Sequence, residues 1–220
     1  YPIGSYDFTA NAESFSRMLL IIMVVQAFVA WDVALRGVRA ACRLRYDHAG
    51  MLLVLTIACA VDAVIAIRDG RIAFCPAVTL QLSMALLGEY SMQLAKVRTL
   101  KAACSKEPKA AVREEKAWHG EDCIFRSDAK PEEFVRELEI PDAGSRMMRI
   151  YAPVLTAVTL GLSVLSMLQA EDSFLWAWTA LMIASFPAGM FLSFSRPFAA
   201  QARRLSRAGA AVGGWYGARM

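Results

Sequence analysis

Two acidic residues inside apolar stretches are the first candidates for chemistry in this sequence. Asp62 lies in the apolar stretch 50–67, and Glu89 lies in the stretch 72–95. A charged side chain at the centre of a bilayer costs roughly 2.5–3.5 kcal/mol on insertion scales, so such residues usually face a bundle interior or a cavity. We therefore predict that both acids border an ion pathway, with Glu89 pointing at its centre and Asp62 nearer the outer mouth.

Each acid also has a structural interpretation, and the sequence leaves both open. Asp62 lies five residues before the end of its stretch, where its side chain can extend outward to water. Glu89 lies seven residues before Lys96, and it can pair with a basic side chain at the membrane edge.

Pro187 interrupts an apolar stretch, "IASFPAGMFLSFSRPF". Proline has no N–H and its ring clashes with the carbonyl four residues back, so Ile183 is predicted to lose its helical partner. Phe186 and Ala188 flank the proline. Broken helices at membrane depth are tolerated where they line a cavity, and they often mark ion sites. Oxygen ligands from the carbonyl and the acids would suit a hard cation.

A kink without function is the alternative for Pro187, with Ser185 or Ser193 satisfying the backbone. Elsewhere, His119 and Cys123 are spaced like half a metal site, but no second pair accompanies them, so a solvated loop is predicted. The sequence has no Gly-rich phosphate loop, no zinc signature and no nucleophile–base pair. We therefore assign no catalytic residue and no metal-ligating set.

Five apolar stretches must position these residues. They cover residues 18–35, 50–67, 72–95, 150–169 and 174–194. A spanning helix needs roughly 20 mostly apolar residues, and the chain is 57% hydrophobic. We predict an all-α polytopic transmembrane helix bundle of about five spans with a small cytoplasmic insertion, and the lipid bilayer as its main partner.

Basic residues gather at one end of the predicted spans. Four arginines lie between the first and second spans. Directly after the third come Lys96, Arg98 and Lys101, and after the fifth come Arg196, Arg203, Arg204 and Arg207. Because excess Lys and Arg mark the cytoplasmic side, we predict that Tyr1 lies outside and Met220 inside. The net charge of +4 is thus assigned to topology, and no nucleic-acid partner is expected.

Five regions follow from this topology. They are an extracytoplasmic segment (1–17), spans one to three (18–96) with an amphipathic cytoplasmic connector (36–49), a short cytoplasmic insertion (97–149), spans four and five (150–195) and a cytoplasmic tail (196–220). A plain basic loop is the alternative for the connector. Within the insertion, "AKPEEFVRELE" predicts a short helix, because Pro131 suits its first turn, and "EDCIF" predicts one strand. The five cysteines show no CxxC spacing, and no disulfide is expected.

The order of elements from Arg36 to Met220 resembles the membrane region of heavy-metal-type P-type cation-transporting ATPases. "ALRGVRAACRLRYDHAGMLLVLTIA" is similar to the family's amphipathic platform and the span after it, and "LLGEYSMQLAKVRTLKAA" to the helix that leads to the actuator domain. "SRMMRIYAPVLTAVTLGLSVL" resembles the helix that re-enters the membrane. The stretch around Pro187 resembles the ion-binding helix and its stalk, in which Arg203 and Arg204 match a basic pair.

The sequence also departs from that family. The cysteines of the family's Cys-Pro-Cys-type motif are replaced by Phe186 and Ala188, which cannot ligate a metal. The Thr-Gly-Glu actuator loop and the Asp-Lys-Thr-Gly phosphorylation motif are absent, and the insertion is a reduced actuator-like region. The resemblance therefore implies no particular metal.

What the resemblance implies is the membrane-embedded part of a P-type ATPase-like cation transporter in a bacterial plasma membrane. The missing initiator Met and the odd number of spans predict that the sequence is a fragment. Phosphorylation and nucleotide-binding domains would lie beyond it and use Mg²⁺ and ATP, whereas this chain alone is expected to hold no cofactor and to be non-catalytic. The alternative is a non-enzymatic multi-pass membrane scaffold or sensor.

Overall fold

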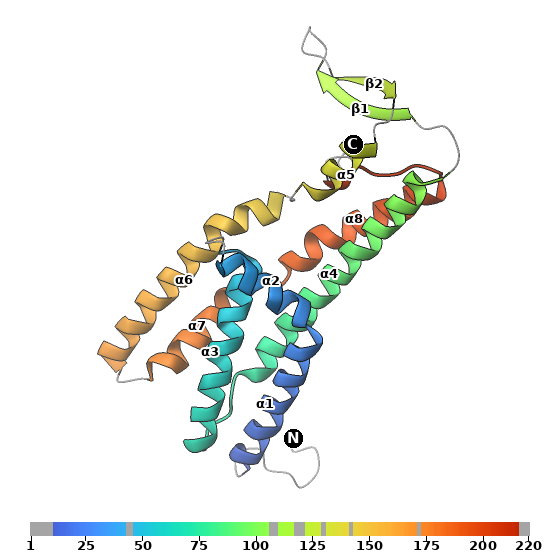
Figure 1. Cartoon of the computed structure of the whole chain (residues 1–220). Helices are drawn as coiled ribbons and strands as arrows, with labels where there is room; N and C mark the ends of the chain where they lie inside the picture. Colours follow the sequence, from blue (N-terminus) through green and yellow to red (C-terminus); the bar gives the residue numbers. More distant parts are fainter. Residues whose placement is uncertain are drawn as a thin grey trace, which may run out of the picture. The chain divides into compact units, whose positions relative to one another are not determined.

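The computed structural model describes residues 11–42, 46–105, 110–116, 122–128, 131–140, 143–170 and 173–215. Most of these residues are helical (Figure 1). The helices are α1 (Ala12–Val29), α2 (Trp31–Cys42), α3 (His48–Arg68), α4 (Cys75–Ala103), α5 (Pro131–Glu139), α6 (Ala143–Ala170), α7 (Phe174–Ser185) and α8 (Met190–Arg207). The strands β1 (Ala110–Lys116) and β2 (Asp122–Asp128) form an antiparallel pair. The predicted all-α fold class is confirmed.

Four stretches of the described residues are long and apolar enough to cross a membrane. They are Ala12–Val29, His48–Arg68, Glu132–Gln169 and Phe174–Arg207. The predicted third span lies in α4, which is a long helix but is not among these four stretches. Its polar residues, Gln81 and Glu89 among them, make it less apolar than the others. The structure therefore supports a helical protein able to cross a membrane, and the count of five spans stays a prediction.

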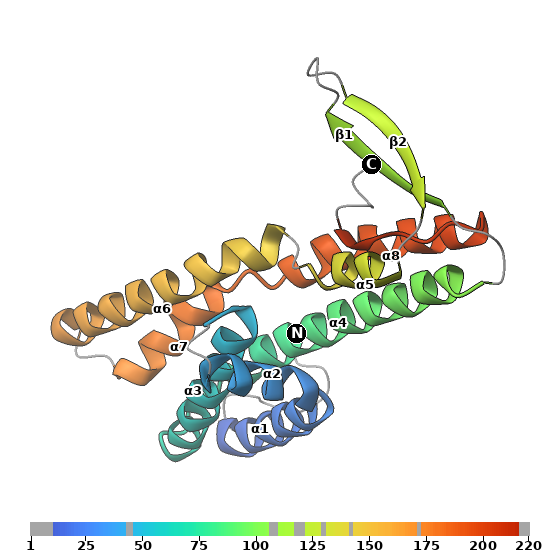
Figure 2. The ribbon, with the colours of Figure 1, turned by 45° about the horizontal axis from the view of Figure 1, so that its top comes forward.

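The chain divides into two compact units, and the first comprises residues 1–86 and 145–189. Within it, α1 and α2 pack against α3, and α3 packs against α7, as Figure 2 also shows. The approach of α2 to α3 requires a glycine, because a Cβ added at Gly37 would lie 2.7 Å from the carbonyl oxygen of Ala49. Asp47 caps α3 by accepting hydrogen bonds from the N–H groups of Ala49 and Gly50.

The second unit comprises residues 87–144 and 190–220. Its core joins the later part of α4 to α5, α8 and the segment that follows α8. The core residues are Ala95, Leu138, Phe198, Ala202 and Val212. At Gly88 the two long helices approach closely, since an added Cβ would lie 2.6 Å from the carbonyl oxygen of Phe191.

Local predictions in the polar regions are largely confirmed. The amphipathic connector is a helix, although α2 begins at Trp31 and ends at Cys42, before α3 starts at His48. The short helix in the insertion is α5, and the predicted strand, residues 121–125, overlaps β2 from Asp122 onward. Strand β1 was not predicted, because its residues, "AAVREEK", do not alternate regularly between apolar and polar.

Candidate ion site at the helix break

The fifth predicted span is broken at the predicted place. Helix α7 ends at Ser185 and α8 begins at Met190. Phe186 adopts an extended conformation, and its N–H still donates to the carbonyl of Met182 at 3.0 Å. The N–H of Ala188 turns back to the carbonyl of Phe186 at 2.9 Å. The chain therefore makes a tight turn around Pro187 and does not continue the helical ladder.

The carbonyl of Ile183 is satisfied by a side chain from another helix. Nε2 of Gln81, on α4, donates to this oxygen at 3.2 Å. The carbonyl of Ser185, at the end of α7, accepts a hydrogen bond from the hydroxyl of Tyr151 on α6 at 3.5 Å. Three segments that are distant in the sequence thus meet at the end of α7.

Neither serine expected to repair the kink reaches the carbonyl of Ile183. Oγ of Ser185 donates to the carbonyl of Leu181 at 2.6 Å, and Oγ of Ser193 donates to that of Met190 at 3.0 Å. Each hydroxyl bonds within its own helix, as serine often does in helices. The repair comes instead from Gln81, which the sequence marks only as a polar residue able to bond to another helix.

The other end of the Gln81 amide has no described hydrogen-bond partner. Gln81 is 6% exposed, and its Oε1 is buried without a hydrogen-bond donor among the described residues. Leaving such an acceptor unsatisfied costs about 1–3 kcal/mol, and an unmatched group of this kind often marks an unseen water or ion. A buried oxygen near the break is therefore able to coordinate a cation or to accept a hydrogen bond from water.

The turn around Pro187 is loosely packed at its last residue. Phe186 is buried, whereas Pro187 and Ala188 are half-buried and Gly189 is exposed. A Cβ added at Gly189 would meet no described atom within 4 Å. The small residues after the proline are thus not needed for close packing within the described chain.

Asp62 is engaged in an ion pair. Its side chain is fully buried, and Oδ2 accepts from Nη1 of Arg71 at 3.3 Å, while Oδ1 accepts from Nη2 at 2.5 Å. Ser16 secures the arginine, because its Oγ donates to the carbonyl of Arg71 at 2.9 Å and accepts from the N–H of Ala73 at 3.2 Å. Both carboxylate oxygens of Asp62 therefore serve the turn between α3 and α4.

Glu89 belongs to the second unit, where it is half-buried on α4. Its predicted orientation toward the break stays a prediction. The described part of the first unit groups Gln81, Ile183 and Pro187, and it ties Asp62 to Arg71. No group of three or more His, Cys, Asp or Glu side chains able to hold a metal occurs among the described residues. His119 lies outside them, so the His119–Cys123 spacing is not tested.

Another contact fixes the connector between α2 and α3. The hydroxyl group of Tyr46 lies 3.1 Å from that of Thr156, which is on α6. Burial raises the pKa of Tyr46, against the smaller opposite effect of the Thr156 hydrogen bond. The phenol therefore stays protonated at neutral pH.

Comparison with known proteins adds no relative to this description. No family model matches the chain, and neither the curated proteins nor the solved structures contain a match.

Proposed function

We propose that the chain is the membrane-embedded part of a P-type ATPase-like cation transporter, with its ion path at the break around Pro187. The observation that carries this proposal is the buried, unpaired Oε1 of Gln81, on the amide that bonds to the Ile183 carbonyl. A fully packed kink has no need of an unsatisfied oxygen at that place.

The ligands at the break would all be neutral oxygens. They are the Gln81 amide, the second lone pair of the Ile183 carbonyl and the carbonyl of Ser185. The C-terminal end of α7 adds the negative end of a helix dipole. Unwound carbonyls and C-terminal ends of half-helices coordinate cations in membrane transporters, and neutral oxygens suit hard cations better than soft ones.

The P-type part of the proposal is supported by the order of the elements. An amphipathic helix, α2, lies between two apolar helices; a polar insertion with a hairpin and α5 follows α4; and a broken helix leads into the basic helix α8. This order corresponds to the family resemblance. In that setting, Mg²⁺ and ATP would act on further domains, and the protein would lie in a bacterial plasma membrane.

A non-enzymatic scaffold or sensor is the competing function, and one observation favours it. Arg71 already neutralises Asp62, so this acid has no charge to offer a cation. If the Gln81–Ile183 bond merely closes the kink, the first unit is a structural bundle.

Cation binding by the purified chain in lipid nanodiscs separates the two functions. Isothermal titration with Na⁺, K⁺, Mg²⁺ and Ca²⁺ should find that one of them binds. Gln81→Leu removes a ligand, so it should weaken that binding by at least the roughly 10–100-fold that the loss of a supporting group costs at a metal site. Ser83→Ala is the matched control, because Ser83 lies on the same helix and bonds Gln26. The cation site is refuted if wild type binds none of the four ions, or if both variants bind like wild type.

A further inference from the structure

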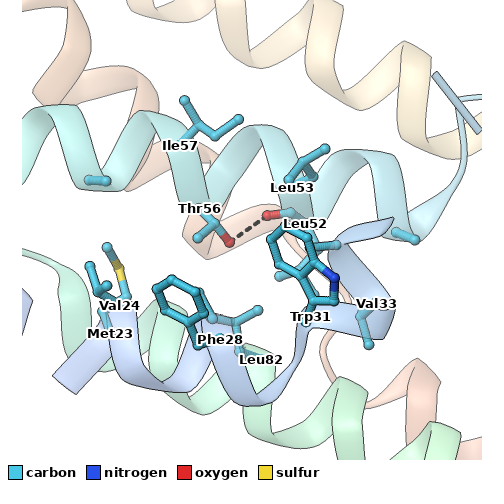
Figure 3. A pocket seen from close by; sticks show the side chains of 14 residues that line it. Met23, Val24, Phe28, Trp31, Val33, Leu52, Leu53, Thr56, Ile57 and Leu82 are labelled. Carbon is cyan, nitrogen blue, oxygen red and sulfur yellow. Dashed lines mark hydrogen bonds between the residues drawn. The ribbon is translucent and has the colours of Figure 1, made fainter. Parts of the chain in front are cut away.

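An apolar groove lies between α1, α2 and α3 in the first unit. Its volume is about 240 Å³. Figure 3 shows Met23 and Phe28 on one wall, Leu53 and Ile57 on the other, and Trp31 near one end. The hydroxyl in the lining belongs to Thr56, and it is satisfied by the carbonyl of Leu52 at 2.7 Å. Apart from the indole N–H of Trp31 at one end, the lining therefore offers an occupant apolar contacts only.

The groove is open on the side that would face lipid. Phe28 is 71% exposed, Trp31 55% and Ile57 56%. Helices α1 and α3, which form its walls, are both long and apolar enough to cross a membrane. A groove of this kind within a bilayer is filled by an apolar chain, because water in it would find few hydrogen-bonding partners.

One end of the groove carries the features of a membrane interface. Helix α2 is strongly amphipathic, with exposed Trp31 and Val38 on its apolar side. The rings of Trp31 and Phe28 stack with their centroids 6.4 Å apart, and Trp is enriched at membrane interfaces. Arg36 and Arg39 follow on the same helix, five and eight residues after Trp31, and both are exposed.

We propose that this groove binds one acyl chain of an anionic phospholipid, whose phosphate is held at α2 by Arg39. The chain lies between α1 and α3, and Trp31 lies at the level of the ester groups. Asp32 stands on the same helix and offsets part of the positive charge. The preference for an anionic over a zwitterionic headgroup should therefore be modest, about fivefold, as expected for one basic residue near the surface.

Native mass spectrometry of the whole purified chain tests the proposal. The chain is mixed with equal amounts of phosphatidylglycerol and phosphatidylcholine that have identical acyl chains. We expect one retained lipid per chain, with phosphatidylglycerol preferred about fivefold, and we expect Arg39→Gln to abolish most of that preference. Arg17→Gln is the control for charge, because Arg17 is exposed on α1 but does not line the groove.

Filling the groove should remove the lipid altogether. Ala60→Phe projects into it from α3, and Ala27→Leu does so from α1. Val61→Phe is the matched control, since Val61 is exposed on α3 and does not line the groove. Circular dichroism identifies any variant that loses helix. If one of the two filling variants does so, lipid retention by the other one tests the proposal.

Three results would overturn the proposal. The first is equal retention of both lipids by wild type, which indicates surrounding lipid only. The second is unchanged retention in both folded filling variants. The third is a lipid-free dimer that the filling variants convert to monomer, because a second copy of the chain would then occupy the groove.

Discussion

Asp62 and Arg71 form one ion pair, but they are not equivalent partners. Asp62 is fully buried, whereas the Arg71 side chain is 25% exposed. Removing one partner of a buried pair costs about 3–5 kcal/mol, because the other charge is left without compensation. Water can reach Arg71 in part, and it cannot reach Asp62. We therefore predict that Arg71→Ala lowers the free energy of unfolding more than Asp62→Ala does.

Unfolding of the purified chain in detergent, followed by circular dichroism, measures this difference. Arg17→Ala is the control, since Arg17 pairs with Glu13 on an exposed face of α1, where such pairs contribute about 0–1 kcal/mol. If Asp62→Ala lowers the free energy of unfolding more than Arg71→Ala does, the difference in solvent exposure does not decide the cost of leaving each charge unpaired.

Two cysteines provide a second test at this scale. Cys59 on α3 and Cys75 at the start of α4 are both fully buried, and the two thiols are neighbours. Cys42 and Cys104 are exposed. We predict that a membrane-permeant maleimide labels the exposed pair quickly and the buried pair slowly, because access limits thiol reactivity.

Oxidation of the same protein should join Cys59 to Cys75. Diamide as the oxidant takes up two electrons and two protons from the thiols as the S–S bond forms. Peptide mapping of a Cys123→Ser variant identifies the linked pair, and Cys75→Ser is the control. Fast labelling of Cys59, or cross-links only between the exposed thiols, would contradict the contact.

At the residue scale, the sequence identified the proline but not the residue that completes the site. Pro187 could be recognised because its effect on Ile183 is local and follows from its missing N–H. Gln81 lies 102 positions before its partner. No local rule relates two residues at that separation, so the contact needed a tertiary structure.

The segment after α8 depends on two glycines that differ in their surroundings. Both Gly209 and Gly214 have positive φ, at 79° and 66°. A Cβ at Gly209 would meet no described atom within 4 Å, whereas a Cβ at Gly214 would lie 2.3 Å from the carbonyl oxygen of Glu137 on α5. Gly214 is thus required both by its backbone conformation and by its close contact with α5, whereas Gly209 is required by its backbone conformation alone.

Alanine at these positions should therefore have unequal effects. Gly209→Ala should cost about 1 kcal/mol from the left-handed conformation alone. Gly214→Ala should cost more, because the backbone of α5 must also move away. Limited proteolysis of the insertion and thermal unfolding both report this difference, and equal behaviour of the two variants would contradict the packing of the segment against α5.

At the element scale, apolar blocks located the helices because burial and membrane insertion both depend on such blocks. Helix α5 was predicted from Pro131 at its first turn. The start of α1 was not: Ala12 begins a turn and a half before the apolar block, and its polar residues are helical because Ser16 packs against the α3–α4 turn. The interaction of residue Val212 with α5 likewise depends on tertiary packing.

For the whole molecule, the predicted orientation gives a direct labelling test. The basic residues in ranges 36–45, 96–101 and 196–207, which flank the predicted spans, should lie in the cytoplasm. The connection between α6 and α7 should lie outside. In a cysteine-free background, a cysteine at Ser173 should react with an impermeant maleimide added to intact cells. A cysteine at Ser105 should react only after lysis, and its labelling from outside would refute the topology.

The division of the chain into two units bears on the site at the break. The chain passes from one unit to the other three times: inside α4 after Leu86, inside α6 after Gly144, and at the break after Gly189. The first passage is continuous helix, so the helix that carries Gln81 runs on into the second unit. The third passage follows the turn around Pro187, where the helical ladder does not continue. The two ends of the Gln81–Ile183 bond are therefore joined to the second unit by different kinds of backbone, a continuous helix on one side and a turn on the other.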